Sequence, residues 1–76
     1  MEKLIALLSS VNEDVDWQNS ADLMDSGALD SFDIISIVAN LSDEYGVEIG
    51  AEELLPENFN SASAILAMIE RLLQLR

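Results

Sequence analysis

The sequence predicts an all-α fold, a small bundle of three main helices and one short helix. Apolar residues recur at helical spacing in three separate segments, and residues that favour helix starts or ends stand at the limits of those segments. The chain has 76 residues, of which 50% are hydrophobic, so it can build one thin core. We therefore expect residues 1–76 to form a single small helical domain.

The first predicted helix lies near the N-terminus. Its apolar residues recur at i, i+3, i+4 and i+7 and share one face: Leu4, Ile5, Leu7, Leu8 and Val11. A long polar connection follows over residues 12–30, with turn signals at 19–20 and 25–27. Such connections in small domains usually carry function or wrap the core. The connection has four isolated apolar residues that we expect to act as anchors: Trp17, Leu23, Met24 and Leu29.

The second predicted helix begins at Asp30. Asp30 is a favoured N-cap, and Asp33 places a second negative charge in the first turn, near the positive end of the helix dipole. Gly46 is suited to terminate this helix. At 100° per residue, the main apolar stripe consists of Ile34, Ile37, Val38, Leu41 and Tyr45. A second apolar stripe on one flank consists of Phe32, Ile35 and Ala39.

The C-terminal part of the sequence predicts the short helix and the last main helix. Residues 47–50 alternate like a strand, but the segment is too brief and lacks a partner. Pro56 suits the first position of a short helical turn, and Ser61 is expected to cap the last helix. Arg71 and Arg76 lie near the C-terminus of that helix, where cations complement its dipole. Its predicted apolar face consists of Ile65, Leu66, Met68, Ile69, Leu72 and Leu73.

The composition excludes most kinds of independent chemistry. The sequence has 15 acidic and 3 basic residues, a formal net charge of −12, and neither His nor Cys. It therefore lacks a Ser-His or Cys-His pair, a thiolate zinc site and an internal disulfide. Three cations are too few to bind nucleotide phosphates or a nucleic acid. We expect no catalytic residue and no nucleic-acid partner, and any charged partner should present a basic face.

Targeting and metal-binding signals are also missing. The apolar start is too short for a signal peptide, and no apolar run approaches the length of a membrane span. We therefore expect a cytoplasmic protein without membrane insertion. Asp14-x-Asp16 opens like a calcium loop, but position six is Asn19 rather than Gly and position twelve is Asp25 rather than Glu. We accordingly expect no metal site.

Ser31 is the candidate for modification. It follows Asp30 at the first turn of a helix, after a long loop and beside an apolar flank. On local grounds alone, a cap followed by an uninvolved serine is the favoured interpretation of this junction. Without a neighbouring base, Ser31 cannot activate itself as a nucleophile, but another enzyme can modify it. Ser26 also follows an aspartate, but it precedes Gly27 and is typical of a turn.

Residues 4–73 resemble the acyl carrier protein family. The resemblance covers the first amphipathic helix, the long loop, the Asp30-Ser31 junction, residues 45–49, residues 56–59 and the final helix beginning at Ser61. It implies an up-and-down four-helix bundle. It also implies that Ser31 is the attachment site of 4′-phosphopantetheine, which a phosphopantetheinyl transferase adds from coenzyme A. Acyl or aminoacyl groups would then be held as thioesters and delivered to partner enzymes.

The same resemblance implies a partner surface on the second helix. It implies a monomer that binds loading ligases and acyl-transferring enzymes through basic patches on those enzymes. The implied contacts are the apolar flank of Phe32, Ile35 and Ala39 and the acidic residues Asp33, Asp43 and Glu44. The alternative is that the flank packs against residues 12–30 as part of the core.

Three departures from the family pattern bear on the subtype. Phe32 stands where the family usually has Leu, and Ser36, Asn40 and Ser42 reduce the acidic charge along the middle of the helix. The spacing between Gly27 and Asp30 resembles D-alanyl carrier proteins, so a role in cell-wall teichoic acid modification is one alternative. An acidic interaction module that binds a basic protein is another, and it rests on charge alone.

Overall fold

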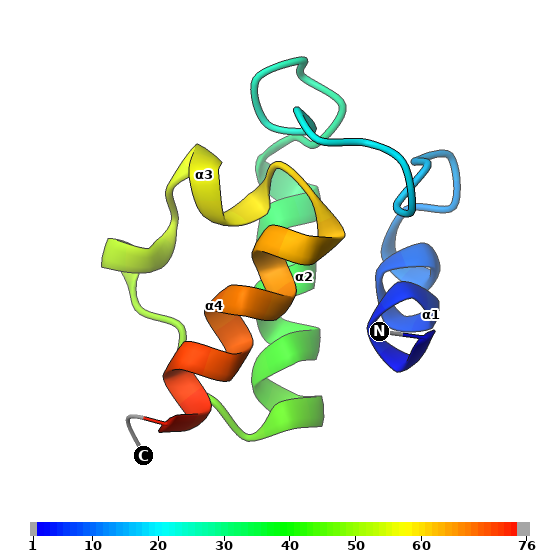
Figure 1. Ribbon diagram of the computed structural model, residues 1–76. Helices are drawn as coiled ribbons and strands as arrows, with labels where there is room; N and C mark the ends of the chain where they lie inside the picture. The colour runs from blue at the N-terminus through cyan, green and yellow to red at the C-terminus, as the bar shows by residue number, and fades with distance from the viewer. Residues whose placement is uncertain (1, 75–76) are drawn as a thin grey trace.

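The computed structural model describes residues 2–74, which are all-helical apart from turns and loops (Figure 1). No strand occurs within this range, and residues 47–50 are an irregular connection. The prediction of an all-α fold is confirmed. The elements are α1 (Glu2–Val11), α2 (Ser31–Tyr45), the 3₁₀ turn η1 (Ala51–Glu53), α3 (Pro56–Phe59) and α4 (Ala62–Gln74).

The helices alternate in direction as in an up-and-down bundle. In Figure 1, α1 runs upward and α2 downward, the segment with η1 and α3 returns upward, and α4 runs downward. Helix α1 contacts α2 and α4, and α3 contacts α4. The third helix has only 4 residues, so the return is mostly irregular chain.

The core is formed by the apolar faces that the sequence predicts. Buried residues come from every helix and also from the 12–30 connection, whose predicted anchors pack with them. One residue differs: Leu73 is 38% exposed, because it lies in the last turn of α4, where neighbouring elements no longer cover it. Arg76, predicted beside the same helix end, lies outside the described residues. The core cluster is Leu4, Leu8, Trp17, Leu23, Leu29, Ile34, Ile37, Leu41, Phe59, Ala62, Ile65, Met68 and Ile69.

The helix ends follow the local sequence signals. Gly46 ends α2 in the left-handed conformation, with φ of 65°, and its N–H donates to the Ser42 carbonyl. Pro56 occupies the start of α3, where no backbone donor is needed. The Ser61 hydroxyl accepts a hydrogen bond from the Ala64 N–H at 3.0 Å and so caps α4.

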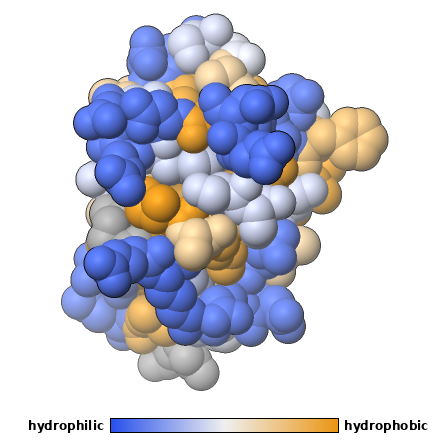
Figure 2. All heavy atoms as spheres, turned by 90° about the vertical axis from the view of Figure 1, so that its right-hand side faces the viewer, coloured by the Kyte–Doolittle hydropathy of each residue, from blue (hydrophilic) through white to orange (hydrophobic). Residues whose placement is uncertain are grey.

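Polar side chains cover most of the surface on the α1 side of the molecule, with apolar atoms showing in gaps between them (Figure 2). Within residues 2–74, both cations are used in ion pairs: Lys3 with Glu44 at 3.1 Å, and Arg71 with Glu53. The Lys3 ammonium also lies 5.1 Å from the centre of the Tyr45 ring. Among the described helices, none has the length and apolar character that crossing a membrane requires.

Candidate functional site

Ser31 is the first residue of α2, and its side chain is exposed. The backbone around it is fixed by a reciprocal cap. The Asp33 N–H donates to Asp30 Oδ1 at 2.9 Å, and the Asp30 N–H donates to Asp33 Oδ2 at 3.3 Å. Asp30 therefore caps the helix as predicted, and Ser31 is held between two residues that fix each other.

The capping carboxylate of Asp33 is also tied to the end of α1. The Asn12 side-chain amide donates to Asp33 Oδ2 at 3.3 Å, while the Asn12 carbonyl accepts from the Trp17 indole N–H at 3.0 Å. Trp17 is buried, so Asn12 links the core to the start of α2. Asp33 is half-buried and its carboxylate already accepts from the Asp30 N–H and the Asn12 amide, so it is less available to a partner than an exposed carboxylate.

The loop that leads to Ser31 is fixed by Asn60, at the junction between α3 and α4. Its side-chain oxygen accepts hydrogen bonds from the Met24 and Asp25 N–H groups at 2.9 and 3.2 Å. Its side-chain amide donates to the Asp25 carboxylate at 3.1 Å, and its carbonyl accepts from the Leu23 N–H at 3.0 Å. Four bonds to one asparagine hold the connection against the bundle, so Ser31 is displayed from a fixed backbone.

An open apolar hollow of about 430 Å³ lies beside Ser31. Asp30 contributes the one charged side chain among its lining residues. The hollow can accept an apolar group close to the Ser31 hydroxyl, and its carboxylate disfavours an anionic one. The lining residues are Met24, Leu29, Asp30, Ser31, Ile34, Ile35, Leu54 and Phe59.

The predicted flank of α2 is on the surface. Phe32 is 82% exposed and Ile35 66% exposed, and Ala39 is exposed as well. The alternative that this flank packs against residues 12–30 as core is therefore wrong. Asp43 and Glu44 are also exposed, near the other end of the helix, where Glu44 pairs with Lys3.

The other sequence candidates have local structural roles. The Ser26 hydroxyl donates to the Leu23 carbonyl and accepts from the Ala28 N–H, both at 3.4 Å, as expected for a turn. The Asp16 carboxylate accepts from the Asn19 amide rather than forming a calcium loop. Across residues 2–74, no three carboxylates are grouped closely enough to hold a metal ion.

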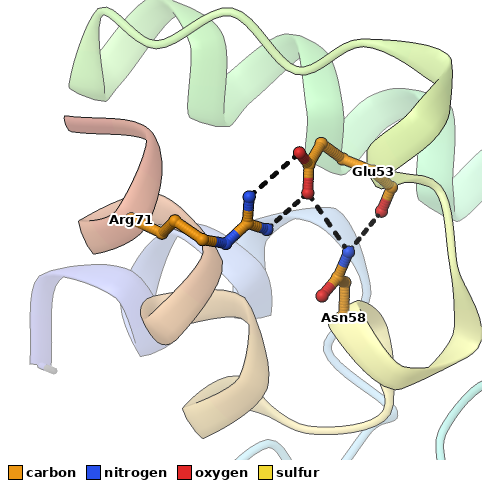
Figure 3. Close-up of polar contacts among 3 residues, drawn as sticks. All are labelled: Glu53, Asn58 and Arg71. Carbon is orange, nitrogen blue, oxygen red and sulfur yellow. Dashed lines mark hydrogen bonds and ion pairs between the residues drawn. The ribbon is translucent and has the colours of Figure 1, made fainter. Parts of the chain in front are cut away.

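A second polar cluster joins η1, α3 and α4 (Figure 3). The Arg71 guanidinium donates to both carboxylate oxygens of Glu53, at 3.0 Å for Nη1 to Oε2. The Asn58 amide donates to the Glu53 carbonyl at 2.7 Å and to its Oε1 at 3.4 Å. The hydrogen bond from Arg71 lowers the pKa of Glu53, and the reciprocal bond raises the pKa of Arg71.

Sequence reasoning missed three contributors to the polar contacts and to the hollow. Asn60 gave no signal, because its bonds reach residues 35 to 37 positions away. The Glu53–Arg71 pair gave none either, although Arg71 does stand in the last turn of α4 as predicted. Leu54 was detectable, since an apolar pair just before Pro56 in an acidic stretch indicates a local apolar contact.

The small helical bundle, with a serine exposed at a capped helix start beside an apolar hollow, has the features expected of a carrier protein. The sequence comparisons agree. The profile described as phosphopantetheine attachment site matches residues 2–74, and the chain belongs to this family. A relative named D-alanyl carrier protein, from Leuconostoc citreum (strain KM20), is 23% identical over 73 residues, covering 95% of this chain and 94% of the relative. No solved structure matches the chain significantly.

Membership defines the cofactor. Members of this family carry a covalently attached 4′-phosphopantetheine group, act with phosphopantetheinyl transferases and loading ligases, and are generally non-catalytic. The structure fits such a group: Ser31 offers an exposed hydroxyl at the start of α2. The adjacent hollow offers apolar surface next to that hydroxyl.

Proposed function

We propose that this protein is a standalone carrier, one domain acting as a monomer in the cytoplasm, with 4′-phosphopantetheine attached to Ser31. The observation that supports this is the exposed Ser31 at the start of α2, in a chain of the phosphopantetheine attachment family. When attached, the group supplies a thiol that holds acyl or aminoacyl cargo as a thioester, a chemistry for which the chain has no Cys of its own.

The chain's residues position the modification and leave its chemistry to partners. Asp30 and Asp33 fix the backbone on either side of Ser31, so that its hydroxyl oxygen is presented at a defined place. Since the chain has no His and both neighbouring carboxylates are engaged in the cap, the transferase would supply the base that takes the Ser31 proton. Partner enzymes would then load and remove the cargo.

Partners are proposed to dock on the exposed part of α2. Phe32, Ile35 and Ala39 supply apolar contact next to Ser31, while Asp43 and Glu44 favour basic patches farther along the helix. Asp33 is proposed to act mainly through the cap, since it is half-buried and bonded to Asn12. The net charge of −12 speeds encounter with basic enzymes.

The test of the modification is an intact mass. We expect the purified chain, incubated with coenzyme A and a broad-specificity phosphopantetheinyl transferase, to gain one phosphopantetheine group. Ser31→Ala should abolish the adduct, whereas Ser26→Ala is the matched control and should retain it, because Ser26 also follows an aspartate. A wild-type chain without an adduct would contradict the carrier proposal and favour the acidic interaction module, whose binding to a basic protein is independent of Ser31.

For the cargo, D-alanine is the first candidate, as in a carrier for teichoic acid modification. Two observations support it: the relative named D-alanyl carrier protein aligns with 95% of this chain, and a carboxylate is the one charged group lining the hollow. That carboxylate favours a neutral or cationic cargo over an anionic one. The modified chain should accept D-alanine from a D-alanine-adenylating ligase. Loading only by a fatty-acyl ligase would replace D-alanine with a fatty acid while leaving the carrier role intact.

A further inference from the structure

One residue that lines the hollow, Leu54, comes from a segment whose own apolar residues are not buried. None of the residues of η1 is buried, and the two leucines that follow it, Leu54 and Leu55, are 44% and 43% exposed. Residues 50–58 are therefore held little by hydrophobic burial. The buried apolar positions that flank them are Ile49, which is half-buried, and Phe59, which is fully buried. Leu54 nevertheless lines the hollow together with Ile35 and Phe59.

Glu53 is the point at which this segment is held. Its side chain is only 13% exposed, compared with 47% for Arg71, so the carboxylate lies largely covered under the guanidinium. The two-pronged contact from Arg71 fixes the carboxylate, and Asn58 binds the Glu53 carbonyl from α3 (Figure 3). The same carbonyl accepts from the Leu55 N–H at 2.8 Å. Arg71, Glu53 and Asn58 together form what we call the Glu53 clasp.

We propose that Arg71 is a positioning residue: acting through Glu53, it holds Leu54 in place and so sets the shape of the hollow beside Ser31. The proposal rests on the proposed function in one respect, namely that the surface around the hollow is used when the carrier meets its enzymes. The geometric part is independent of that function, because Leu54 follows Glu53 directly and its own N–H bonds to Ala51 across η1 at 3.1 Å.

The first experiment follows the methyl resonances of Leu54 and Ile35 by NMR in the full chain. Arg71→Gln and Glu53→Gln should shift and broaden both resonances. The conformation in which Leu54 no longer lines the hollow should become about two- to fivefold more populated, which is the range expected for losing an ion pair near a protein surface. Lys3→Gln is the matched control, because it removes the cation of the other ion pair with the same change in net charge. The double variant Glu53→Arg with Arg71→Glu should move the resonances part of the way back to wild type, because it restores the ion pair but not the acceptor for Asn58.

Equal changes in Arg71→Gln and Lys3→Gln, or unchanged Leu54 resonances in Arg71→Gln, would overturn the proposal. Neither result depends on modification of Ser31, so failure here is distinguishable from failure of the carrier function.

The second experiment measures kinetics of the loading ligase with the modified chain. We expect Arg71→Gln to raise the KM for the carrier about two- to fivefold while kcat stays unchanged, since the clasp shapes a contact surface and takes no part in the reaction. Lys3→Gln removes the same charge and frees Glu44 for a basic partner, so it should not raise the KM, and the charge-exchanged double variant should bring the KM back toward the wild-type value. A fall in kcat with an unchanged KM would contradict a positioning role.

Discussion

Helix α2 has two apolar stripes. Both have helical spacing in the sequence, but only one of them is buried in the folded protein. Ile34 is 9% exposed and Ile37 is fully buried, whereas Ile35 is 66% exposed and Phe32 82%. The neighbours Ile34 and Ile35 differ by about 100° around the helix. The first face therefore supplies stability. The second leaves apolar surface uncovered beside Ser31, and this is the surface that we propose for partner contact.

The largest expected effect separates the two faces by stability. Ile37→Ala removes a fully buried side chain and should lower the free energy of unfolding by about 2–5 kcal/mol, enough to unfold much of a small domain. The matched substitution Ile35→Ala should change it by less than about 0.5 kcal/mol. Urea denaturation followed by circular dichroism measures both. Comparable losses in the two variants would mean that the outer face is also core.

The second test separates the faces by use. Phe32→Ala and Ile35→Ala should each lower kcat/KM for loading by a partner ligase about tenfold, as loss of an exposed apolar contact at the centre of an interface does. The helical circular dichroism signal should stay at the wild-type level. Gln18→Ala, an exposed position in the 12–30 connection, provides a control with unchanged turnover. Turnover that is unaffected in both α2 variants would remove the partner role from this face.

A smaller effect should separate the acidic residues of α2 into one that stabilises the fold, Asp33, and one that contacts partners, Asp43. Asp33→Ala removes the carboxylate that accepts from the Asp30 N–H and from the Asn12 amide, while the bond from its own N–H to Asp30 remains, and it should reduce the free energy of unfolding by about 1 kcal/mol. Asp43→Ala, at an exposed position, should leave stability nearly unchanged and slow association with a basic partner at low salt. Thermal unfolding and stopped-flow association distinguish the two. The reverse pattern would make Asp33 a partner contact.

The smallest effect concerns the Glu53 clasp, which lies next to Leu54 in the chain. Because Arg71 lowers the pKa of Glu53 in the folded chain, the clasp stabilises the fold above the ordinary Glu pKa, and this contribution is lost as the pH falls through the lowered value. The difference in Tm between wild type and Glu53→Gln should thus be greatest near neutral pH and vanish in acid. Arg71→Gln should show the same trend, because it removes the other partner of the ion pair. A constant difference at all pH values would exclude the ion pair as its cause.

Much of the fold was predictable, because its signals are local. Helical periodicity, Asp30 and Ser61 as caps, Gly46 as a terminator and Pro56 at a helix start each act within a few residues, and each is found as predicted. Ser31 as the candidate was also accessible from sequence, through the Asp30-Ser31 junction in its helical setting. The reciprocal use of Asp33 as a second capping group lay within reach of the same rules.

The rest depended on contacts between distant parts of the chain. Asn60 holds residues 23–25, Asn12 reaches Asp33, and Arg71 reaches Glu53, and each pairing requires the bundle to be assembled first. Periodicity alone cannot tell which of two apolar stripes will be covered, because burial depends on the neighbours that the other helices and loops provide. The sequence by itself therefore determined the helices, their ends and the candidate serine. The tertiary structure decided which face of α2 is core, which is surface, and what encloses the hollow beside Ser31.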